Sequence, residues 1–253
     1  MKTYGLIGYR LSHSFSKKYF TEKFQAEGIS DCQYENFQMD SVDQFPLLLK
    51  SIDNLKGLNV TIPYKEQIIP YLNECDPAAK EIGAVNVIKI EADGTLIGYN
   101  SDYFGFKETL SAFIGYSFEH KKALVLGTGG AAKAAVTALK HLNIPFQVVS
   151  RTKGKDIISY EEINKEIISS HNIIINTSPL GMYPDTESFP LLPYEFLTSQ
   201  HYLYDLIYNP EQTIFMKKAE EYGAHTLNGL PMLIGQAEKA WEIWNSIKKQ
   251  GSL

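Results

Sequence analysis

Cysteine and histidine are scarce in this chain of 253 residues, which contains two cysteines and six histidines. Cys32 and Cys75 lie far apart in the sequence, no CxxC pair occurs, and the histidines are scattered without the spacing of metal ligands. A disulfide framework or a zinc site would need such clusters. We therefore expect two reduced structural thiols and no metal.

Long apolar runs and an excess of positive charge are also missing. No stretch approaches the length of a membrane span, and the first residues, MKTYGLIGYR, reach an arginine before a signal-peptide core could form. The 24 basic residues are outnumbered by 29 acidic ones, which disfavours nucleic acid or an anionic membrane as the main partner. We expect a cytoplasmic protein that binds small molecules, with any anion site confined to a local patch.

The hydrophobic fraction of 44% and the charged fraction of 21% are typical of a globular protein, and the length favours two domains over one. In the first hundred residues, short β-rich runs alternate with helical patterns, as in TYGLIG, SKKYFTEKFQAEG and CQYENF. This alternation predicts an α/β domain with a parallel sheet. Asp93-Gly94, between VNVIKIE and TLIGYN, predicts a hairpin turn because both residues tolerate positive φ angles.

A second series of strands and helices begins with KKALVLG near residue 121, and MLIGQAEKAWEIW is typical of an amphipathic helix. We expect an N-terminal α/β domain over residues 1–102, a Rossmann-type parallel-sheet domain over 103–227, and a C-terminal segment over 228–253. In that last segment we expect a helix from about Leu230 to Lys248 that packs back on the first domain.

A glycine-rich turn follows the strand KKALVLG and opens the helical pattern GTGGAAKAAVTAL. Gly127 and Gly129 occupy the positions that a dinucleotide-binding turn requires, and Ala132 takes the third, helix-packing position. Glycine lets the backbone approach a pyrophosphate, which the free N–H groups of the helix start can bind. Tight strand-to-helix packing without a ligand is the alternative.

The next strand, PFQVVS, ends where NAD enzymes usually carry an Asp or Glu that binds the ribose hydroxyls. Here the chain continues with Ser150, Arg151 and Thr152, and Lys153 and Lys155 follow. A guanidinium group without a nearby carboxylate suits the 2′-phosphate of NADP. The alternative is a solvated basic turn.

Two further strands end in polar loops that contain proline, HNIIINTSPLGM and YLYDLIYNP, and the first of these loops also contains a glycine. Loops at the carboxyl ends of parallel strands are the usual ligand-binding loops of such sheets. Either loop could also be an ordinary connection.

The order of motifs along nearly the whole chain resembles that of the shikimate dehydrogenase family. The motifs are SHSFS at 12–16, NVTIPYK at 59–65, GAVNV at 83–87, GYNSD at 98–102, GTGGAAKA at 127–134, SRT at 150–152, INTSPLGM at 175–182, DLIYNP at 205–210 and NGLPMLIGQA at 228–237. The resemblance implies an oxidoreductase of aromatic amino acid and chorismate biosynthesis. Such an enzyme uses NADP(H) to reduce 3-dehydroshikimate reversibly to shikimate. The resemblance is compatible with a homodimer, and the sequence leaves the oligomeric state open.

The resemblance implies that the domain over residues 1–102 binds the substrate and carries catalysis, and that the domain over 103–227 binds NADP. It also implies a catalytic pair, Lys65 and Asp102. Hydride transfer to a ketone builds negative charge on the oxygen, which an ammonium group can stabilise and protonate. A carboxylate can orient that ammonium group and bind a substrate hydroxyl. Without the motifs, Lys65 would be taken as solvated surface and Asp102 as a favourable residue at a helix N-terminus.

Further site residues are implied by their matching positions in the motifs. For a small, hydroxylated carboxylate substrate they are Ser14, Ser16, Thr61, Asn86, Tyr208 and Gln236. For the cofactor they are Gly127, Gly129, Gly130, Ala131, Ser150, Arg151, Thr152, Lys155, Thr177, Ser178, Met182, Leu206 and Gly229. Each also has a structural alternative, because serines cap helices, asparagines form turns and a glutamine can be a neutral helix position.

Two positions depart from the family pattern, since Ser150 replaces an asparagine and Ser101 replaces a threonine. Both keep a short hydrogen-bonding side chain.

Two other functions stay open: a related dehydrogenase that prefers quinate or NAD, and an inactive NADP-binding regulatory protein. The missing carboxylate after PFQVVS disfavours NAD, and the presence of Lys65 and Asp102 disfavours the inactive protein.

Overall fold

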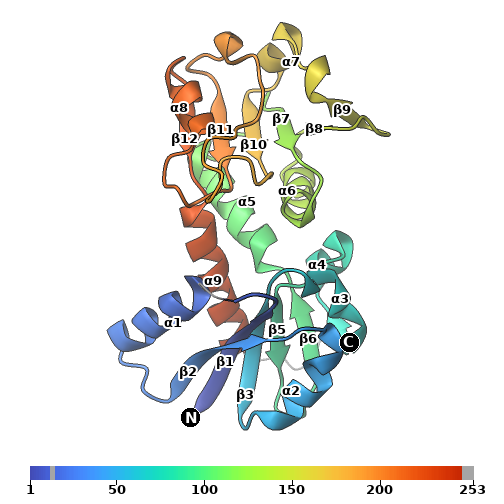
Figure 1. Cartoon of the computed structure of the whole chain (residues 1–253), viewed down its shortest axis with the longest axis vertical. Coiled ribbons are helices and arrows are strands. Elements are labelled where there is room, and N and C mark those ends of the chain that lie inside the picture. Colours follow the sequence, from blue (N-terminus) through green and yellow to red (C-terminus); the bar gives the residue numbers. More distant parts are fainter. Residues whose placement is uncertain (12–14, 247–253) are drawn as a thin grey trace. The chain divides into compact units, whose positions relative to one another are not determined.

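The computed structural model describes residues 1–11 and 15–246, which form two compact units (Figure 1). The first unit consists of Met1–Ser101 together with the chain from Ala237, and the second consists of Asp102–Gln236. Each unit contains a six-stranded sheet. Across the described residues, no helix is both long and apolar enough to span a membrane. The functional roles that the sequence assigns to the domains stay predictions.

The sheet of the first unit is mixed rather than parallel. Its strands are β1 (Lys2–Gly8), β2 (Cys32–Gln38), β3 (Leu55–Val60), β4 (Glu74–Cys75), β5 (Val87–Ile90) and β6 (Leu96–Tyr99), in the order β2-β1-β3-β5-β6-β4. β1 pairs in parallel with β2 and β3, whereas β5 runs antiparallel to both β3 and β6. The prediction of a parallel sheet is therefore wrong for β5. The hairpin predicted at Asp93-Gly94 is confirmed, with a φ of 85° at Gly94.

Alternating side chains give this sheet two buried faces. Tyr4 and Leu6 pack with α1 (Phe15–Ala26) and with the end of α9 (Leu230–Asn245). Ile7 and Leu58 pack in a separate cluster with the helices on the other side of the sheet. Those helices are α2 (Phe45–Ser51), α3 (Tyr64–Gln67) and α4 (Pro77–Ile82). The short 3-10 turn η1 (Val42–Gln44) directly precedes α2, and η2 (Ile69–Tyr71) lies between α3 and α4 in the chain.

The sheet of the second unit is entirely parallel. Its strands are β7 (Ala123–Leu126), β8 (Phe146–Ser150), β9 (Ile157–Ser159), β10 (Ile173–Asn176), β11 (Tyr202–Asp205) and β12 (His225–Leu227). They are ordered β12-β11-β10-β7-β8-β9. Counted from β7, this is the order 3-2-1-4-5-6 that defines dinucleotide-binding sheets, and the strand order reverses between β7 and β10. The predicted Rossmann-type sheet is confirmed.

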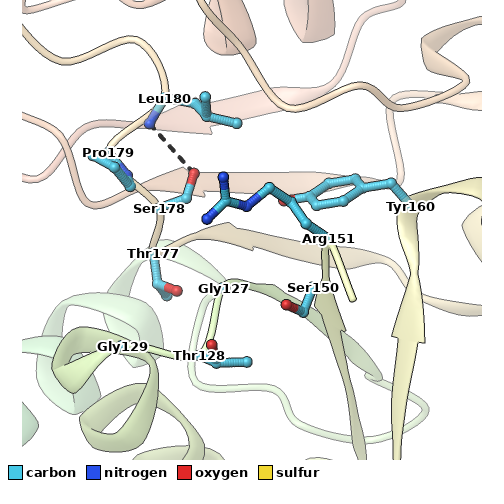
Figure 2. A pocket seen from close by; sticks show the side chains of 10 residues that line it. All are labelled: Gly127, Thr128, Gly129, Ser150, Arg151, Tyr160, Thr177, Ser178, Pro179 and Leu180. Carbon is cyan, nitrogen blue, oxygen red and sulfur yellow. Dashed lines mark hydrogen bonds between the residues drawn. The ribbon is translucent and has the colours of Figure 1, made fainter. Parts of the chain in front are cut away.

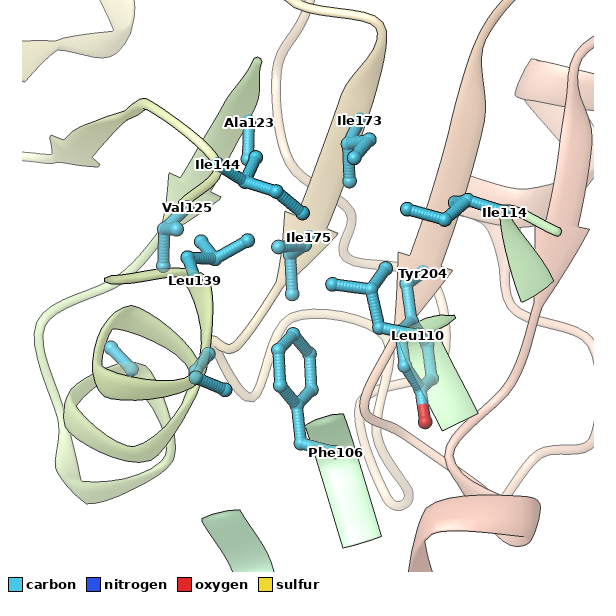
Figure 3. Packing of buried hydrophobic residues seen from close by; sticks show 13 residues of the cluster. Phe106, Leu110, Ile114, Ala123, Val125, Leu139, Ile144, Ile173, Ile175 and Tyr204 are labelled. Carbon is cyan, nitrogen blue, oxygen red and sulfur yellow. The ribbon is translucent and has the colours of Figure 1, made fainter. Parts of the chain in front are cut away.

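Helices cover both faces of this parallel sheet, which explains why its central strands are apolar on both sides. Ile173 and Ile175 of β10 point toward α5 (Ser101–Phe113) and α6 (Gly130–His141), where they meet Phe106 and Leu110 (Figure 3). Ile174 points the other way. There it packs in a cluster with residues of α7 (Lys165–Ser170), α8 (Ile214–Glu220) and the 3-10 turn η4 (Tyr194–Phe196).

The C-terminal helix α9 ends at Asn245. The predicted end at Lys248 lies outside the described residues. Within the first unit, Trp244 of α9 donates a hydrogen bond from Nε1 to the carbonyl of Ile88 at 3.0 Å, and its indole ring lies directly over Gly57 of β3. This contact anchors the end of the helix to the sheet.

Candidate cofactor site at the reversal of strand order

The turn between β7 and α6 brings the backbone close to the next loop. Gly127 has a φ of 124°, and a Cβ atom there would lie 2.6 Å from Oγ1 of Thr177. The Thr177 hydroxyl donates to the carbonyl of Leu126 at 2.8 Å, which fixes the two loops together. Only glycine fits this position, on grounds of both φ and space.

The start of α6 is open to an anion. Gly129 is the N-cap residue and no side chain caps the helix. A Cβ atom at Gly129 or Gly130 would meet nothing within 4 Å. The first amide N–H groups of this twelve-residue helix therefore have no side-chain cap, and the helix dipole favours a phosphate beside them.

Two neighbouring cavities lie along the carboxyl ends of the parallel strands. One, of about 320 Å³, is lined by Gly127, Thr128, Gly129, Ser150, Arg151, Tyr160, Thr177, Ser178, Pro179 and Leu180 (Figure 2). The other, of about 470 Å³, is lined by Gly129, Gly130, Ala131, Thr177, Ser178, Pro179, Met182, Tyr183, Leu206, Ile207, Tyr208 and Asn209. Because they share Gly129 and the segment 177–179, they form one elongated site at the reversal of strand order, where ligands bind in such sheets.

Arg151 is the charged residue among those that line the first cavity. It follows the last residue of β8, Ser150, and its side chain is exposed. Tyr160, which opens the 3-10 turn η3 (Tyr160–Glu162), lines the same cavity. Burial raises the pKa of the Tyr160 hydroxyl, and the nearby Arg151 charge acts in the opposite direction. A guanidinium beside an aromatic ring can bind a phosphate and a planar base together.

The basic loop after Arg151 is held by an ion pair. Lys153 Nζ lies 2.6 Å from Glu162 Oε1, and the other carboxylate oxygen of Glu162 accepts from the Ser159 amide at 2.9 Å. The Lys153 hydrogen bond lowers the pKa of Glu162. Lys153 is thereby engaged in positioning the loop, whereas Thr152 and Lys155 are exposed and line neither cavity.

Most of the residues that the sequence assigns to the cofactor are brought together here. Those that line the cavities are Gly127, Gly129, Gly130, Ala131, Ser150, Arg151, Thr177, Ser178, Met182 and Leu206. Gly229 is not a lining residue. It lies beneath Leu206, donates its amide to the Ile207 carbonyl at 2.9 Å, and has no room for a Cβ atom. Gly229 therefore shapes the wall of the site through its packing.

Several lining residues were not expected from the sequence: Thr128, Tyr160, Pro179, Leu180, Tyr183, Ile207 and Asn209. All except Tyr160 and Tyr183 lie within the recognised motifs, so the loop position itself is the signal that could have found them. Tyr160 follows the added edge strand β9, and nothing in its local sequence indicates a binding role.

The predicted catalytic residues lie on two helices, Lys65 on the short α3 and Asp102 on the thirteen-residue α5. Lys65 is half-buried in α3, and its carbonyl accepts from the Val85 amide at 2.7 Å. Asp102 is half-buried in the first turn of α5. The residue before it, Ser101, is tied to Asn86, whose Oδ1 accepts from the Ser101 amide at 2.7 Å and whose Nδ2 donates to the Ser101 hydroxyl at 3.1 Å. Asn86 thus fixes the backbone that leads into Asp102.

The other predicted substrate residues are spread over both units. Ser16, in the first turn of α1, is hydrogen-bonded to Tyr34, and Thr61 donates its amide to the carbonyl of Ile7 at 2.9 Å. Gln236 is buried in α9, where its Nε2 donates to Leu233. Tyr208 is exposed and lines the second cavity beside the residues expected to bind cofactor. Ser14 lies outside the described residues.

Comparison with known proteins gives consistent results. A family model described as "Shikimate dehydrogenase substrate binding domain" matches residues 6–88. A curated relative from Clostridium beijerinckii, a shikimate dehydrogenase (NADP(+)), is 38% identical over 100% of this chain and 95% of its own length.

Solved structures match at the level of the fold as well. Shikimate 5-dehydrogenase from Thermus thermophilus, in complex with NADP(H) and shikimate, has a TM-score of 0.83 at 29% identity, over 98% of this chain and 94% of its own. Quinate dehydrogenase from Corynebacterium glutamicum, in complex with NAD, has a TM-score of 0.86 at 25% identity, over the same shares of the two chains.

Proposed function

Because the chain belongs to the shikimate dehydrogenase family, we propose that it catalyses the reversible reduction of 3-dehydroshikimate to shikimate with NADPH. The reaction adds a hydride to the ring carbonyl carbon and a proton to its oxygen, and it leaves NADP⁺ and an alcohol. The observation that carries the choice of cofactor is Arg151 at the end of β8, in a cavity whose lining residues include no Asp or Glu within the described part of the chain.

The described residues fit an NADP(H) molecule. The uncapped start of α6 and the close approach of Gly127 to Thr177 suit a pyrophosphate, and Arg151 suits a 2′-phosphate. The bound cofactor supplies the hydride. Ser178, Met182 and Leu206 would hold the rest of the cofactor in the second cavity.

The protein's own part in the reaction is assigned to Lys65 and Asp102. The ammonium group of Lys65 stabilises the negative charge that develops on the carbonyl oxygen and then protonates it. The carboxylate of Asp102 orients that ammonium group and binds a substrate hydroxyl. The link from Asn86 to Ser101 holds the backbone from which Asp102 projects.

The substrate is assigned from the family, and hydroxyl and amide side chains suit it. Ser14, Ser16, Thr61, Asn86, Tyr208 and Gln236 would bind its carboxylate and hydroxyls. Location in the cytoplasm and assembly into a homodimer belong to the same proposal.

The test follows NADPH absorbance with purified protein. 3-Dehydroshikimate is offered with NADPH or NADH, and shikimate and quinate are each offered with NADP⁺ or NAD⁺. We expect fast turnover with 3-dehydroshikimate and NADPH and with shikimate and NADP⁺. Preference for quinate or for NAD would favour the quinate dehydrogenase alternative, and binding of NADPH without turnover of any substrate would favour an inactive NADP-binding protein.

A further inference from the structure

Two fully buried polar side chains lie at the adjacent carboxyl ends of β10 and β11. Asn176 and Asp205 are the last residues of their strands and are paired in register. Both are 0% exposed, and Asn176 Nδ2 donates to Asp205 Oδ1 at 3.0 Å. The catalytic assignment above uses neither of them.

Asn176 holds the loop that forms a wall of both cavities. Its Oδ1 accepts from the amide of Ser178 at 3.1 Å and from the Ser178 hydroxyl at 2.7 Å, and its Nδ2 also donates to the carbonyl of Leu180 at 3.3 Å. The Ser178 hydroxyl in turn accepts from the Leu180 amide, the bond drawn in Figure 2. One amide side chain therefore fixes the backbone at both ends of the segment 178–180.

Asp205 holds the next loop, which also lines the second cavity. Its Oδ1 accepts from the amide of Ile207 at 3.1 Å, and its Oδ2 accepts from the hydroxyl of Thr213 at 2.6 Å. Ile207 lines the second cavity together with the residues on either side of it. The Asn176–Asp205 bond joins the two loops beneath the site.

The stability of the sheet alone would not require these two side chains. Burial of a carboxylate is costly, and here it raises the pKa of Asp205 to about 6. Apolar side chains at the same two strand ends would avoid that cost. They would leave the amides of Ser178 and Ile207 without these acceptors, because both amides lie just past the strands, where the sheet offers no partner.

We propose that Asn176 and Asp205 are positioning residues of the cofactor site: they fix the loops 177–180 and 206–208 in the conformation that binds NADP(H). The inference rests on the proposed function, since it takes NADP(H) as the ligand of these loops. It adds a role for two residues that do not line either cavity.

The first test is the dissociation constant for NADPH, measured by titration of NADPH fluorescence. Asp205→Ala and Asn176→Ala each remove several buried hydrogen bonds, and we expect each to weaken NADPH binding by about tenfold or more. Asp205→Asn keeps the shape and the Oδ1 acceptor, so it should recover most of the affinity. Equal NADPH affinity in folded Asp205→Ala and wild-type protein would overturn the proposal.

Tyr204→Phe is the matched control, because it removes a buried hydrogen bond from the neighbouring residue of the same strand. Tyr204 bonds Thr109 at 2.6 Å on the other face of the sheet and lines neither cavity. We expect it to lower the melting temperature while the affinity for NADPH stays unchanged. A loss of affinity equal to that of Asp205→Ala would mean that general destabilisation explains both, and the proposal would fail.

Hydrogen exchange of the wild-type protein without cofactor provides a test that needs no variant. The amides of Ser178 and Ile207 should be protected, since Asn176 and Asp205 already hold them. Rapid exchange at both amides would overturn the proposal even if the alanine variants failed to fold. Failure of the wild-type protein to bind NADPH would instead count against the proposed function, and the exchange result would still decide whether the pair fixes the loops.

Discussion

Arg151 offers the sharpest test of cofactor choice, because NADPH and NADH differ only in the 2′-phosphate. We expect Arg151→Ala to lower the ratio of kcat/KM for NADPH to that for NADH by roughly ten- to a hundredfold, the value of a charge-assisted contact. Contacts common to both cofactors, including the Gly127 turn, cancel in this ratio. Lys155→Ala alone should change this ratio much less, since Lys155 is exposed and does not line the cavity.

A larger loss in the double variant than in Arg151→Ala alone would show that Lys155 compensates in part. If the wild-type enzyme preferred NADH, or if Arg151→Ala left the ratio unchanged, the segment 150–152 would be only a basic turn.

Lys65 is assigned to charge that develops during hydride transfer, so its loss should affect turnover more than substrate affinity. We expect Lys65→Ala to lower kcat by about a hundredfold or more while KM for shikimate changes much less. Asp102→Asn keeps shape and hydrogen-bonding reach but removes the charge, and it should also lower kcat in a folded protein.

Thermal melts separate the catalytic from the structural role of each residue. Near-normal turnover in Lys65→Ala would refute its assignment. If Asp102→Asn lost stability in step with activity, Asp102 would act mainly at the N-terminus of α5.

The end of α9 is anchored where its Trp244 ring meets Gly57 of β3. A Cβ atom on Gly57 would lie 2.2 Å from both Cδ1 and Nε1 of the indole, and the hydrogen bond to the Ile88 carbonyl prevents the ring from moving freely. We expect Gly57→Ala to destabilise the first unit by about 1–3 kcal/mol, the usual cost of overpacking. Urea unfolding followed by tryptophan fluorescence measures this, because both tryptophans, Trp241 and Trp244, pack in that unit.

Trp244→Phe provides the partner for a double-mutant cycle. In that background the ring is smaller, so the added methyl of Gly57→Ala should cost less than it does alone. Additive effects of the two substitutions would mean that the methyl group clashes with something other than the indole.

Elements with strong local patterns could be predicted from the sequence. The glycine turn before α6 and the apolar strands β7 and β10 follow from backbone freedom and two-sided burial, and the hairpin at Asp93-Gly94 follows from its turn residues. The antiparallel placement of β5 beside β3 was missed. Strand direction depends on which neighbour the strand pairs with after a long connection, and no local pattern carries that information.

The cofactor site was also predictable only in part. The sequence allowed the loops after the strands to be assigned to the site, but it did not indicate Tyr160 or the Asn176–Asp205 pair. Tyr160 reaches the cavity only because β9 adds to the edge of the sheet next to β8. Asn176 and Asp205 end apolar strands and look like the start of polar loops, and their burial depends on the neighbouring strands being in register.

Across the whole molecule, the carboxylates include two kinds whose contributions to folding stability change with pH in opposite directions. Hydrogen bonds from Lys2, Tyr71 and Lys153 lower the pKa values of Asp31, Asp43 and Glu162, respectively. The ionised form of each of these carboxylates stabilises the folded state. This contribution is fully present above the pKa that the group has in the unfolded chain, and it is lost as pH falls through the lower pKa of the folded state. Asp205 behaves in the opposite sense, because burial raises its pKa to about 6.

Asp205 therefore gives the molecule a stability component that decreases as pH rises. An unfolded aspartate has a pKa of about 3.9. Between roughly pH 4 and 6, the folded state binds a proton that the unfolded state has lost, so the free energy of unfolding falls as pH increases through this window. Each unit of pKa difference corresponds to about 1.4 kcal/mol.

In Asp205→Asn this component of the stability is absent, while the exposed carboxylates titrate as before. We expect the difference in urea midpoint, wild type minus Asp205→Asn, to fall between pH 4 and 6 and to stay constant from pH 6 to 8. Parallel curves for the two proteins over the whole range would mean that Asp205 titrates at an ordinary pKa and that its buried hydrogen bonds offset its desolvation.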